Sequence, residues 1–308
     1  MSEIEFKSGF ISLAGLPNAG KSTLLNQLAG MHLAITSPKP QTTRQVVRAI
    51  IDEPGLQMVF LDTPGYHTAN TRLGKNMLSS IAAALTDADI VLLVTDASRA
   101  QTASRLPATE QALLERLGKL DKPVILVLNK VDIMVKEQLL PLIERYNKAY
   151  PFAAIIPLSA RNGDGLDDLL AEIRRHLPAG PQYYPLDSVT DLTEREMAAE
   201  LIREQVLLLT HAEIPHGTAV EVEKFEETGS PQRTQVRVSA VIYCDKDSHK
   251  GILIGKQGSM LKAIGTQARL SIEEMAGCPC FLELFVKVRP GWRNRRDILR
   301  TLGLETRS

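Results

Sequence analysis

The chain has 308 residues, which is enough for about two domains that each bury a core of their own. Hydrophobic residues make up 44% and charged residues 23%, a balance that excludes disordered and fibrous proteins. The formal net charge of zero argues against a protein whose whole surface attracts nucleic acid.

Short aliphatic runs alternate with amphipathic stretches through residues 8–180. Buried strands are predicted at 10–14, 57–61, 90–95, 124–128 and 154–157. Helical spacing of apolar residues occurs at 21–28, 73–85, 108–117, 136–150 and 166–177. This alternation predicts an α/β domain with a mainly parallel sheet, flanking helices and a ligand site at the carboxyl ends of the strands.

The segment LPAGPQYYPLD, residues 177–187, is rich in Pro and Gly and interrupts this alternation. We expect a first domain over 1–180, a linker over 181–192 and a second domain over 193–308. The second domain has a different order of predicted elements: a helix at 193–210, strands at 218–225 and 234–244, helices at 248–253 and 259–276, and a strand at 280–288. The order αββααβ predicts an α+β fold.

Charge is unevenly distributed within this second domain. Residues 181–245 contain 5 Lys and Arg against 12 Asp and Glu, whereas residues 246–308 contain 12 against 6. The last part of the chain therefore has the composition of a basic, anion-binding surface.

The spacing of the cysteines and the first residues of the sequence bear on the cellular location of the protein. Cys244, Cys278 and Cys280 have no spacing typical of a zinc site or a disulfide framework, so we expect reduced thiols. The first ten residues lack the pattern of a signal peptide, and the aliphatic runs at 90–94 and 124–128 are too short to span a bilayer. We expect a cytoplasmic protein, or one that associates peripherally with a membrane.

The sequence GLPNAGKS, residues 15–22, fits G-x-x-x-x-G-K-[ST] directly after a predicted strand and at the start of a predicted helix. Glycines let backbone N–H groups turn inward around a phosphate, and the helix N-terminus favours negative charge. Lys21 is placed to reach the outer phosphates, and Ser22 offers a hydroxyl to Mg²⁺. A chance glycine turn is the alternative, which the strand–loop–helix context disfavours.

Two further motifs follow predicted strands and indicate the nucleotide. DTPG (62–65) places Asp62 to hold the Mg²⁺ shell and Gly65 near a γ-phosphate. NKVD (129–132) places Asp132 to accept hydrogen bonds from N1–H and the exocyclic amine of guanine, which adenine does not offer there. Ser159 and Ala160 supply a backbone N–H for the base oxygen. Each motif alone is common in solvated loops, but their order and their positions at strand ends predict GTP rather than ATP.

These segments resemble the translation-factor-related class of small GTPases, and with the C-terminal half the chain resembles the bacterial Era GTPase family over nearly its whole length. The segment ITSPKPQTTRQ (35–45) resembles the first switch, where we favour Thr43 over Thr42 as a magnesium ligand, together with Ser22 and Asp62. The resemblance implies catalytic roles for Lys21, Asn18, Thr43 and Gly65. The complete expected nucleotide site comprises Gly15, Leu16, Pro17, Asn18, Ala19, Gly20, Lys21, Ser22, Thr23, Asp62, Thr63, Pro64, Gly65, Tyr66, Asn129, Lys130, Val131, Asp132, Ser159 and Ala160.

Two features bear on hydrolysis. Tyr66 follows DTPG where Ras-type GTPases have the glutamine that orients water, so we expect slow intrinsic hydrolysis. Asn18 stands where related GTPases help to hold K⁺, so K⁺ is a possible second ion. Leu16 and Ala19 depart from the more usual Arg and Val of Era loops, and we expect little consequence because the backbone holds the phosphate.

A second glycine–lysine loop, GKQG at 255–258, lacks the four-residue gap and the following hydroxyl. Its place between two predicted helices in the order αββααβ resembles a type II KH domain, whose loop clamps about four nucleotides of single-stranded RNA. A helix–turn–helix connection is the alternative. We expect an apolar wall from Ile252, Ile254, Leu261 and Ile264, with Lys250 among the charges. The expected RNA-binding residues are Ile254, Gly255, Lys256, Gln257, Gly258, Lys262 and Arg269. Trp292 either stacks on RNA or packs over a domain edge.

The resemblance implies a Mg²⁺-dependent GTPase that binds 16S ribosomal RNA near its 3′ end and acts in assembly of the 30S subunit. It also implies loose association with the inner membrane, and we expect no stable oligomer. The alternatives are a non-enzymatic RNA-binding scaffold and a membrane-associated signalling GTPase. The complete set of phosphate, magnesium and base motifs disfavours the scaffold, and the second glycine loop disfavours the signalling protein.

Overall fold

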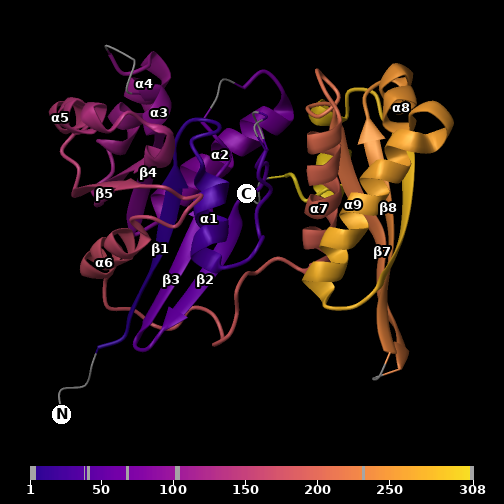
Figure 1. The fold of residues 1–308 in the computed structure, drawn as a ribbon, viewed down its shortest axis with the longest axis horizontal. Coiled ribbons are helices and arrows are strands. Elements are labelled where there is room, and N and C mark those ends of the chain that lie inside the picture. Colours follow the sequence, from indigo (N-terminus) through magenta and orange to yellow (C-terminus); the bar gives the residue numbers. More distant parts are fainter. Residues whose placement is uncertain are drawn as a thin grey trace. The chain divides into compact units, whose positions relative to one another are not determined.

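The computed structural model describes residues 5–37, 39, 42–66, 69–100, 105–230 and 233–305. The chain divides into two compact units, which are described separately (Figure 1). The N-terminal unit contains Met1–Ala34, Thr43–Ala69 and Met77–Asp191, and the C-terminal unit contains Leu192–Ser308 together with Ile35–Thr42 and Asn70–Asn76.

The N-terminal unit is built on a six-stranded sheet with the order β2-β3-β1-β4-β5-β6. Its strands are β1 (Lys7–Ala14), β2 (Val47–Glu53), β3 (Leu56–Asp62), β4 (Ile90–Asp96), β5 (Val124–Asn129) and β6 (Ala154–Leu158). Only β2 is antiparallel to its neighbour. Every residue of β3 and β5 is buried, because helices cover both faces of a parallel sheet. The predicted α/β class is confirmed.

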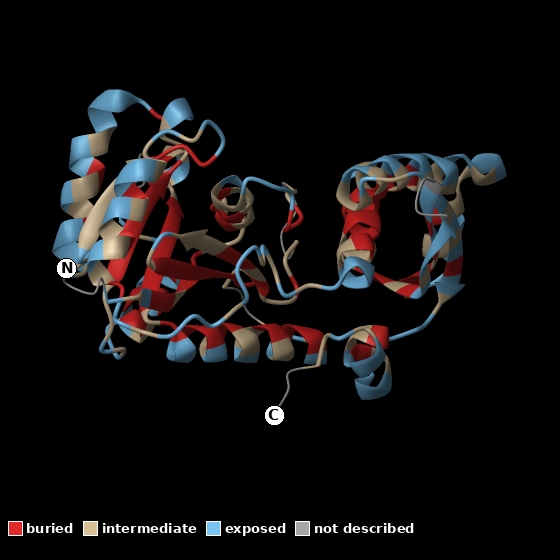
Figure 2. Cartoon of the chain, turned by 90° about the horizontal axis from the view of Figure 1, so that it is seen from below, coloured by how far each residue is buried: buried red, intermediate tan, exposed pale blue. Residues whose placement is uncertain are grey.

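Along the chain, the helices of this unit follow β1, β3, β4, β5 and β6. They are α1 (Lys21–Ala29), α2 (Arg72–Asp87), α3 (Ala97–Ala100), α4 (Ala108–Leu117), α5 (Leu139–Ala149) and α6 (Leu166–His176), with 3-10 turns at Val131–Ile133 and Lys136–Gln138. Residues 136–138 were predicted as the start of one helix but form a separate turn before α5. Figure 2 shows the buried residues of this unit concentrated along its strands and on the inner sides of its helices.

Residues 181–191 pack along the β2–β3 edge instead of leaving the unit. The side-chain oxygen of Gln57 accepts hydrogen bonds from the backbone N–H groups of Tyr183 and Tyr184 at 2.8 and 2.9 Å. Ile50 N–H donates to the carbonyl of Val189 at 2.9 Å. Most of the segment that we expected to link two domains is therefore held against the sheet by hydrogen bonds that its own backbone groups make.

The C-terminal unit has a three-stranded sheet with the order β7-β8-β9. Its elements are α7 (Glu194–Leu209), β7 (Thr218–Ser230), β8 (Arg233–Cys244), α8 (Asp247–Ile254), a 3-10 turn (Lys256–Gly258), α9 (Ser259–Ala276), β9 (Cys280–Val288), a 3-10 turn (Trp292–Asn294) and α10 (Arg296–Thr301). β7 and β8 are antiparallel, whereas β8 and β9 are parallel. The predicted αββααβ order is confirmed, with α10 added after it.

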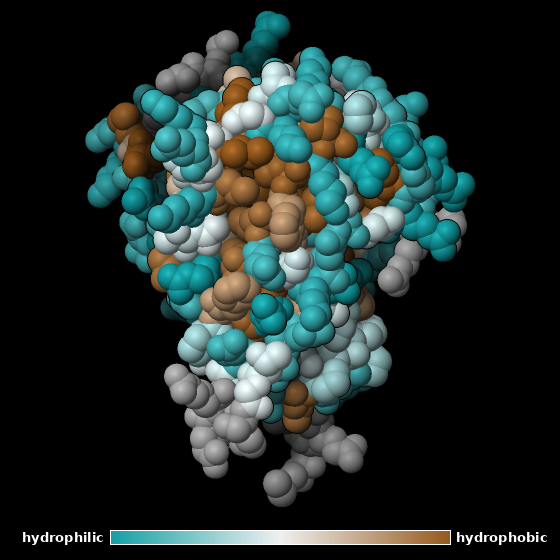
Figure 3. All heavy atoms as spheres, turned by 90° about the vertical axis from the view of Figure 1, so that its right-hand side faces the viewer, coloured by the Kyte–Doolittle hydropathy of each residue, from teal (hydrophilic) through white to brown (hydrophobic). Residues whose placement is uncertain are grey.

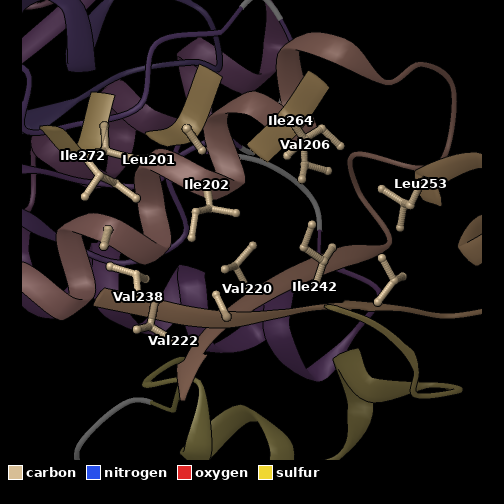
Figure 4. Packing of buried hydrophobic residues seen from close by; sticks show 14 of the residues in the cluster. Leu201, Ile202, Val206, Val220, Val222, Val238, Ile242, Leu253, Ile264 and Ile272 are labelled. Atoms are coloured by element: carbon tan, nitrogen blue, oxygen red, sulfur yellow. The ribbon is translucent and has the colours of Figure 1, made fainter. Parts of the chain in front are cut away.

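The core of this unit lies between α7, α8 and α9 and one face of the sheet (Figure 4). A capping box starts α7, since Thr193 and Glu196 satisfy each other's backbone N–H groups. Val238 and Ile242 of β8 point toward Ile202 and Val206 of α7 (Figure 4). Ile264 of α9 is fully buried in the same cluster. Its expected place in an RNA-facing wall is wrong, because α9 turns that position inward.

Candidate nucleotide site and RNA groove

The phosphate loop joins the end of β1 to the start of α1, and its backbone has left-handed conformations that favour glycine. Gly20 has φ 98°, and a Cβ there would lie 2.1 Å from Nδ2 of Asn129. Gly15 has φ 150°, and a Cβ would lie 2.2 Å from the carbonyl oxygen of Val94. Asn18 also has a positive φ of 63°. Only glycine fits at the two ends of this turn, which leaves the backbone free to surround an anion.

Lys21 lies within this loop and is 6% exposed. Its Nζ donates to the carbonyl oxygens of Gly15 and Leu16 at 3.2 and 3.1 Å. Burial lowers the pKa of the Lys21 ammonium, while Asp62 opposes that effect. The Lys21 side chain is therefore held inside the loop, where an anionic ligand would favour its charged form.

The proposed magnesium ligands lie together beside the loop. Ser22 Oγ donates to Asp62 Oδ2 at 2.6 Å, and Thr43 Oγ1 donates to the same oxygen at 3.2 Å. The two hydroxyl oxygens are 3.0 Å apart. Thr42 instead donates to the carbonyl of Lys39, so the structure brings Thr43 and not Thr42 to this cluster.

The cluster fits a hard cation. Asp62 Oδ1 is buried and has no hydrogen-bond partner among the described residues, which is costly unless a ligand completes it. Burial raises the pKa of Asp62, against the opposing effects of Lys21, Ser22 and Thr43. Within the described part of the chain, no group of three or more His, Cys, Asp or Glu could hold a metal. Two hydroxyls and one carboxylate suit Mg²⁺, which commonly takes its remaining ligands from phosphate and water.

The segment after Asp62 is fastened to the phosphate loop. Tyr66 N–H donates to the carbonyl of Gly15 at 3.2 Å, and Thr63 Oγ1 donates to that of Leu13 at 2.7 Å. A Cβ at Gly65 would lie 2.9 Å from Cα of Pro17. Gly65 is thus required for the close approach of two backbones, and the Thr63–Tyr66 segment borders the phosphate loop.

Asn129 makes hydrogen bonds with three segments of the site. Its Nδ2 donates to the carbonyl of Ala19 at 2.9 Å, and its Oδ1 accepts from the N–H groups of Lys130 and Ala160 at 2.8 and 3.0 Å. It is 2% exposed. One side chain therefore connects the phosphate loop, the NKVD segment and the Ser159–Ala160 loop. Asp132 in contrast is exposed, so its carboxylate is accessible to a ligand.

Asp96 belongs to the site and was missed by sequence reasoning. Its Oδ2 accepts from Lys130 Nζ at 2.6 Å, and Lys130 also donates to the carbonyl of Asn18 at 2.8 Å. Burial alone would raise the pKa of Asp96, but hydrogen bonds from Lys130 and Ser98 lower it below the ordinary value. The available signal was its position as the last residue of a parallel strand, between two strands that already carried motifs.

The second loop connects α8 to α9 and is shaped differently. Gly255, Gln257 and Gly258 have positive φ values of 73°, 53° and 79°. A Cβ at Gly258 would meet nothing within 4 Å. Next to it lies an open groove of about 370 Å³, lined by Gly258, Leu261, Lys262, Gly265, Thr266, Arg269, Leu282 and Leu284.

The structure brings only part of the expected RNA set to this groove. Gly258, Lys262 and Arg269 line it, whereas Ile254, Gly255, Lys256 and Gln257 are not among its lining residues. Sequence reasoning missed the small residues of α9 and the two leucines of β9, Gly265, Thr266, Leu282 and Leu284. Arg269 is also paired with Glu273 at 2.7 Å, which reduces the charge it presents.

Trp292 does not face this groove. It is fully buried, and its Nε1 donates to the carbonyl of Gly217 at 2.9 Å. The sequence left two interpretations of Trp292: packing within the domain is confirmed, and stacking on RNA is wrong. Arg293 next to it pairs with Asp245 at 2.9 Å, so part of the basic excess after residue 246 is neutralised within the unit.

A glycine-rich loop between β1 and α1, with oxygens beside it that suit Mg²⁺, is followed by an αββααβ unit with a second glycine loop. This arrangement is that of a P-loop GTPase that carries a KH domain. Residues 10–130 match the family model of the 50S ribosome-binding GTPases, and residues 213–293 match that of the KH domain. The GTPase Era of Ruminiclostridium cellulolyticum is 44% identical over 303 residues, 98% of this chain and 99% of the relative. The GTPase Era of Syntrophus aciditrophicus is 48% identical over 300 residues, which cover 97% of this chain and 96% of the relative.

Solved structures agree with the sequence comparisons. A crystal structure of Era with MgGDPNP and nucleotides 1506–1542 of 16S ribosomal RNA is 37% identical with a TM-score of 0.92, covering 98% of this chain and 100% of that one. An Era variant from Aquifex aeolicus bound to GDP·AlF₄⁻ has the same identity, coverage and TM-score. The chain belongs to the Era family of GTPases, as the resemblance predicted, and it is a GTPase. None of its described helices has both the length and the apolar composition needed to cross a bilayer.

Proposed function

We propose that the protein binds GTP with Mg²⁺ in the N-terminal unit, binds the 3′ region of 16S ribosomal RNA in the C-terminal groove, and acts in 30S subunit assembly. The observation that carries the nucleotide part is the cluster of Ser22, Thr43 and Asp62 with its unpartnered buried oxygen. The RNA part is supported by the groove beside Gly258 and by the Era relative that was crystallised with this RNA.

The residues have distinct roles in this proposal. The backbone of residues 15–23 surrounds the phosphates, and Lys21 neutralises their charge. Ser22, Thr43 and Asp62 hold Mg²⁺, which supplies positive charge to the oxygens of the transferred phosphoryl group. Asp132 and the N–H of Ala160 recognise guanine. Asn129 and Lys130 hold these loops together, as their bonds to Ala19 and Asn18 indicate.

Hydrolysis is slow in the free protein under this proposal, because the side chain of Tyr66 has no carboxamide to orient water. Asn18 would help to hold K⁺ beside the phosphates, and its backbone is held in place by the hydrogen bond that its carbonyl accepts from Lys130. Measuring GTP turnover in K⁺ and then in Na⁺ buffers tests this. Equal rates in the two buffers would remove K⁺ from the proposal and leave Mg²⁺ in place.

Two variants of the full chain separate the functions. Lys21→Ala should abolish GTP binding and leave RNA affinity unchanged. Gly255→Asp with Gly258→Asp should do the reverse, since the carboxylate at 258 would face phosphate and a side chain at 255 would collide with the backbone of Met260 and distort the loop. Lys119→Ala is the matched control, because Lys119 is exposed on the N-terminal unit. RNA affinity should also fall as salt rises. Loss of both activities in both variants, or RNA affinity that is insensitive to salt, would contradict the division.

Domain limits and location complete the proposal. We assign 1–180 to the GTPase domain, 181–192 to a linker that lies for most of its length along the sheet of the N-terminal unit, and 193–308 to the KH domain. We place the protein in the cytoplasm, with peripheral association with the inner membrane. Limited proteolysis tests the first assignment, and co-sedimentation with anionic vesicles tests the second. Cleavage outside 181–192, or a protein that stays in the supernatant, would refute them in turn.

A further inference from the structure

The sheet face opposite α7 and α9 carries two exposed aromatic rings. Phe281 and Phe285 of β9 are 47% and 50% exposed, although phenylalanine is usually buried. Because side chains alternate along a strand, Phe281, Glu283 and Phe285 share this outer face, while Leu282 and Leu284 point the other way and line the groove. β9 is an edge strand of the sheet. The two rings therefore belong to the same strand as the leucines of the groove wall, but they project from the opposite face of that strand.

An unpaired cation lies against the first ring. The guanidinium carbon of Arg237 is 5.1 Å from the centre of the Phe281 ring, and the two residues are direct neighbours between β8 and β9. Among the described residues Arg237 is in no ion pair, because its neighbour Glu226 pairs with Lys224 at 2.8 Å. A ring beside a guanidinium is a combination with which proteins stack bases and meet phosphates.

The acidic residues of this face are mostly satisfied by their neighbours. Glu221 accepts a hydrogen bond from Tyr243 at 2.6 Å, and Glu223 pairs with Lys287 at 3.1 Å. Glu283 remains, between the two rings and about 6.6 Å along the strand from each. A carboxylate in that position would repel phosphate but accepts hydrogen bonds from an exocyclic amine on a base.

We propose that Phe281, Glu283, Phe285 and Arg237 form a second subsite for the single-stranded RNA that the groove holds. This inference rests on the proposed RNA binding of the groove. An RNA strand leaving the groove across β9 meets the two rings, each of which stacks one base, and Glu283 accepts a hydrogen bond from a base that carries an amine. Arg237 offers its charge to the adjoining phosphate.

Two observations favour RNA over a second copy of the chain as the occupant. The first is that the rings continue the groove across a single strand, so a polymer held in the groove can reach them. Figure 3, which looks onto this side of the C-terminal unit, shows that apolar residues are exposed there within a hydrophilic border. In addition, Glu283 and Lys287 place charges at intervals along the outer face of the edge strand. Charges in such positions discourage pairing between edges of two sheets.

The test compares two RNAs from the 3′ region of 16S ribosomal RNA on the full chain by fluorescence anisotropy. One has roughly four nucleotides, enough for the loop and groove, and the other has roughly 12. Phe281→Ala and Phe285→Ala should each weaken the longer RNA about tenfold and leave the shorter RNA unchanged. Phe285→Leu should behave like Phe285→Ala, and Phe285→Trp should retain affinity, because stacking needs an aromatic face. Leu140→Ala, at a 76% exposed leucine of the other unit, is the control.

A base exchange tests Glu283. Replacing cytosine by uracil beyond the groove should weaken the longer RNA several-fold for the native protein, and Glu283→Gln should reduce that preference. If the Phe variants bind the longer RNA normally while Gly258→Asp abolishes binding of both RNAs, the second subsite is refuted and the groove is not. If Gly258→Asp leaves both intact, the proposed RNA function itself fails. A dimer that Phe285→Ala dissociates without any effect on RNA would assign the face to a second copy and overturn the proposal.

Discussion

Asn129→Ala should destabilise the N-terminal unit even when no nucleotide is bound. The side chain is 2% exposed and makes hydrogen bonds with the backbone of Ala19, Lys130 and Ala160 at 2.9, 2.8 and 3.0 Å. Alanine would leave those groups without their partner. At about 0.5–1.5 kcal/mol net for each bond, the free energy of unfolding should fall by about 2–4 kcal/mol. For a unit of this size that corresponds to about 5–15 °C in Tm.

The chain has one tryptophan, Trp292, which is buried in the C-terminal unit and so provides an internal reference. Urea unfolding of the nucleotide-free protein, followed by far-UV circular dichroism, should show the loss, while the tryptophan fluorescence transition stays in place. Asn162→Ala is the control, because its side-chain bond to Asp164 is exposed and 3.5 Å long. A change in the free energy of unfolding below about 0.5 kcal/mol for Asn129→Ala would mean that water satisfies the three backbone groups. The stabilising role assigned to Asn129 would then be wrong.

Other predictions concern buried groups. Burial raises the pKa of Asp62 despite the nearby Lys21, so ionisation of this carboxyl lowers the free energy of unfolding as pH rises above the ordinary carboxyl range. Asp62→Asn should therefore leave the nucleotide-free chain at least as stable in urea at pH 7, while it abolishes Mg²⁺-dependent GTP binding. Trp292→Ala should cost about 3–5 kcal/mol of unfolding free energy, and Trp292→Phe less, with unchanged GTP affinity in equilibrium dialysis. Burial raises the pKa of Cys280 to about 11, so mass mapping should find it unlabelled by iodoacetamide at pH 8 and labelled as the pH approaches that value.

The nucleotide motifs could be located from the sequence because each lies within a few residues of a strand end. The strand supplies an aliphatic run, and the loop supplies the residue types that the chemistry needs. Asp96 escaped because a lone carboxylate at a strand end carries no motif, although its bond to Lys130 is among the shortest in the site. The edge strand β2 escaped because its second half is only partly buried and carries Asp52 and Glu53, which weakens the signal of a buried run.

The groove was harder to predict because its walls come from separate elements. Leu282 and Leu284 belong to β9, which the parallel crossover brings beside α9 only in the folded unit. Helical spacing grouped Leu261 and Ile264 as one wall, but α9 sends the first to the groove and the second into the core. Sequence periodicity identifies an apolar stripe on a helix, whereas the limit between its core and its rim depends on what packs against it.

The two glycine–lysine loops need glycine for different physical reasons, and that difference separates their ligands. At Gly20 a side chain would collide with Asn129, so the glycine permits the protein to close tightly around a small, highly charged ligand. At Gly258 a Cβ would meet nothing within 4 Å, yet φ is 79°, so the glycine permits a turn that leaves open space above it. A closed loop with an internal ammonium suits a polyphosphate, whose charge is compact. An open turn beside an apolar groove suits a polymer whose phosphates pass by while its bases enter the groove, which is why the second loop can extend its binding surface across β9 and the first cannot.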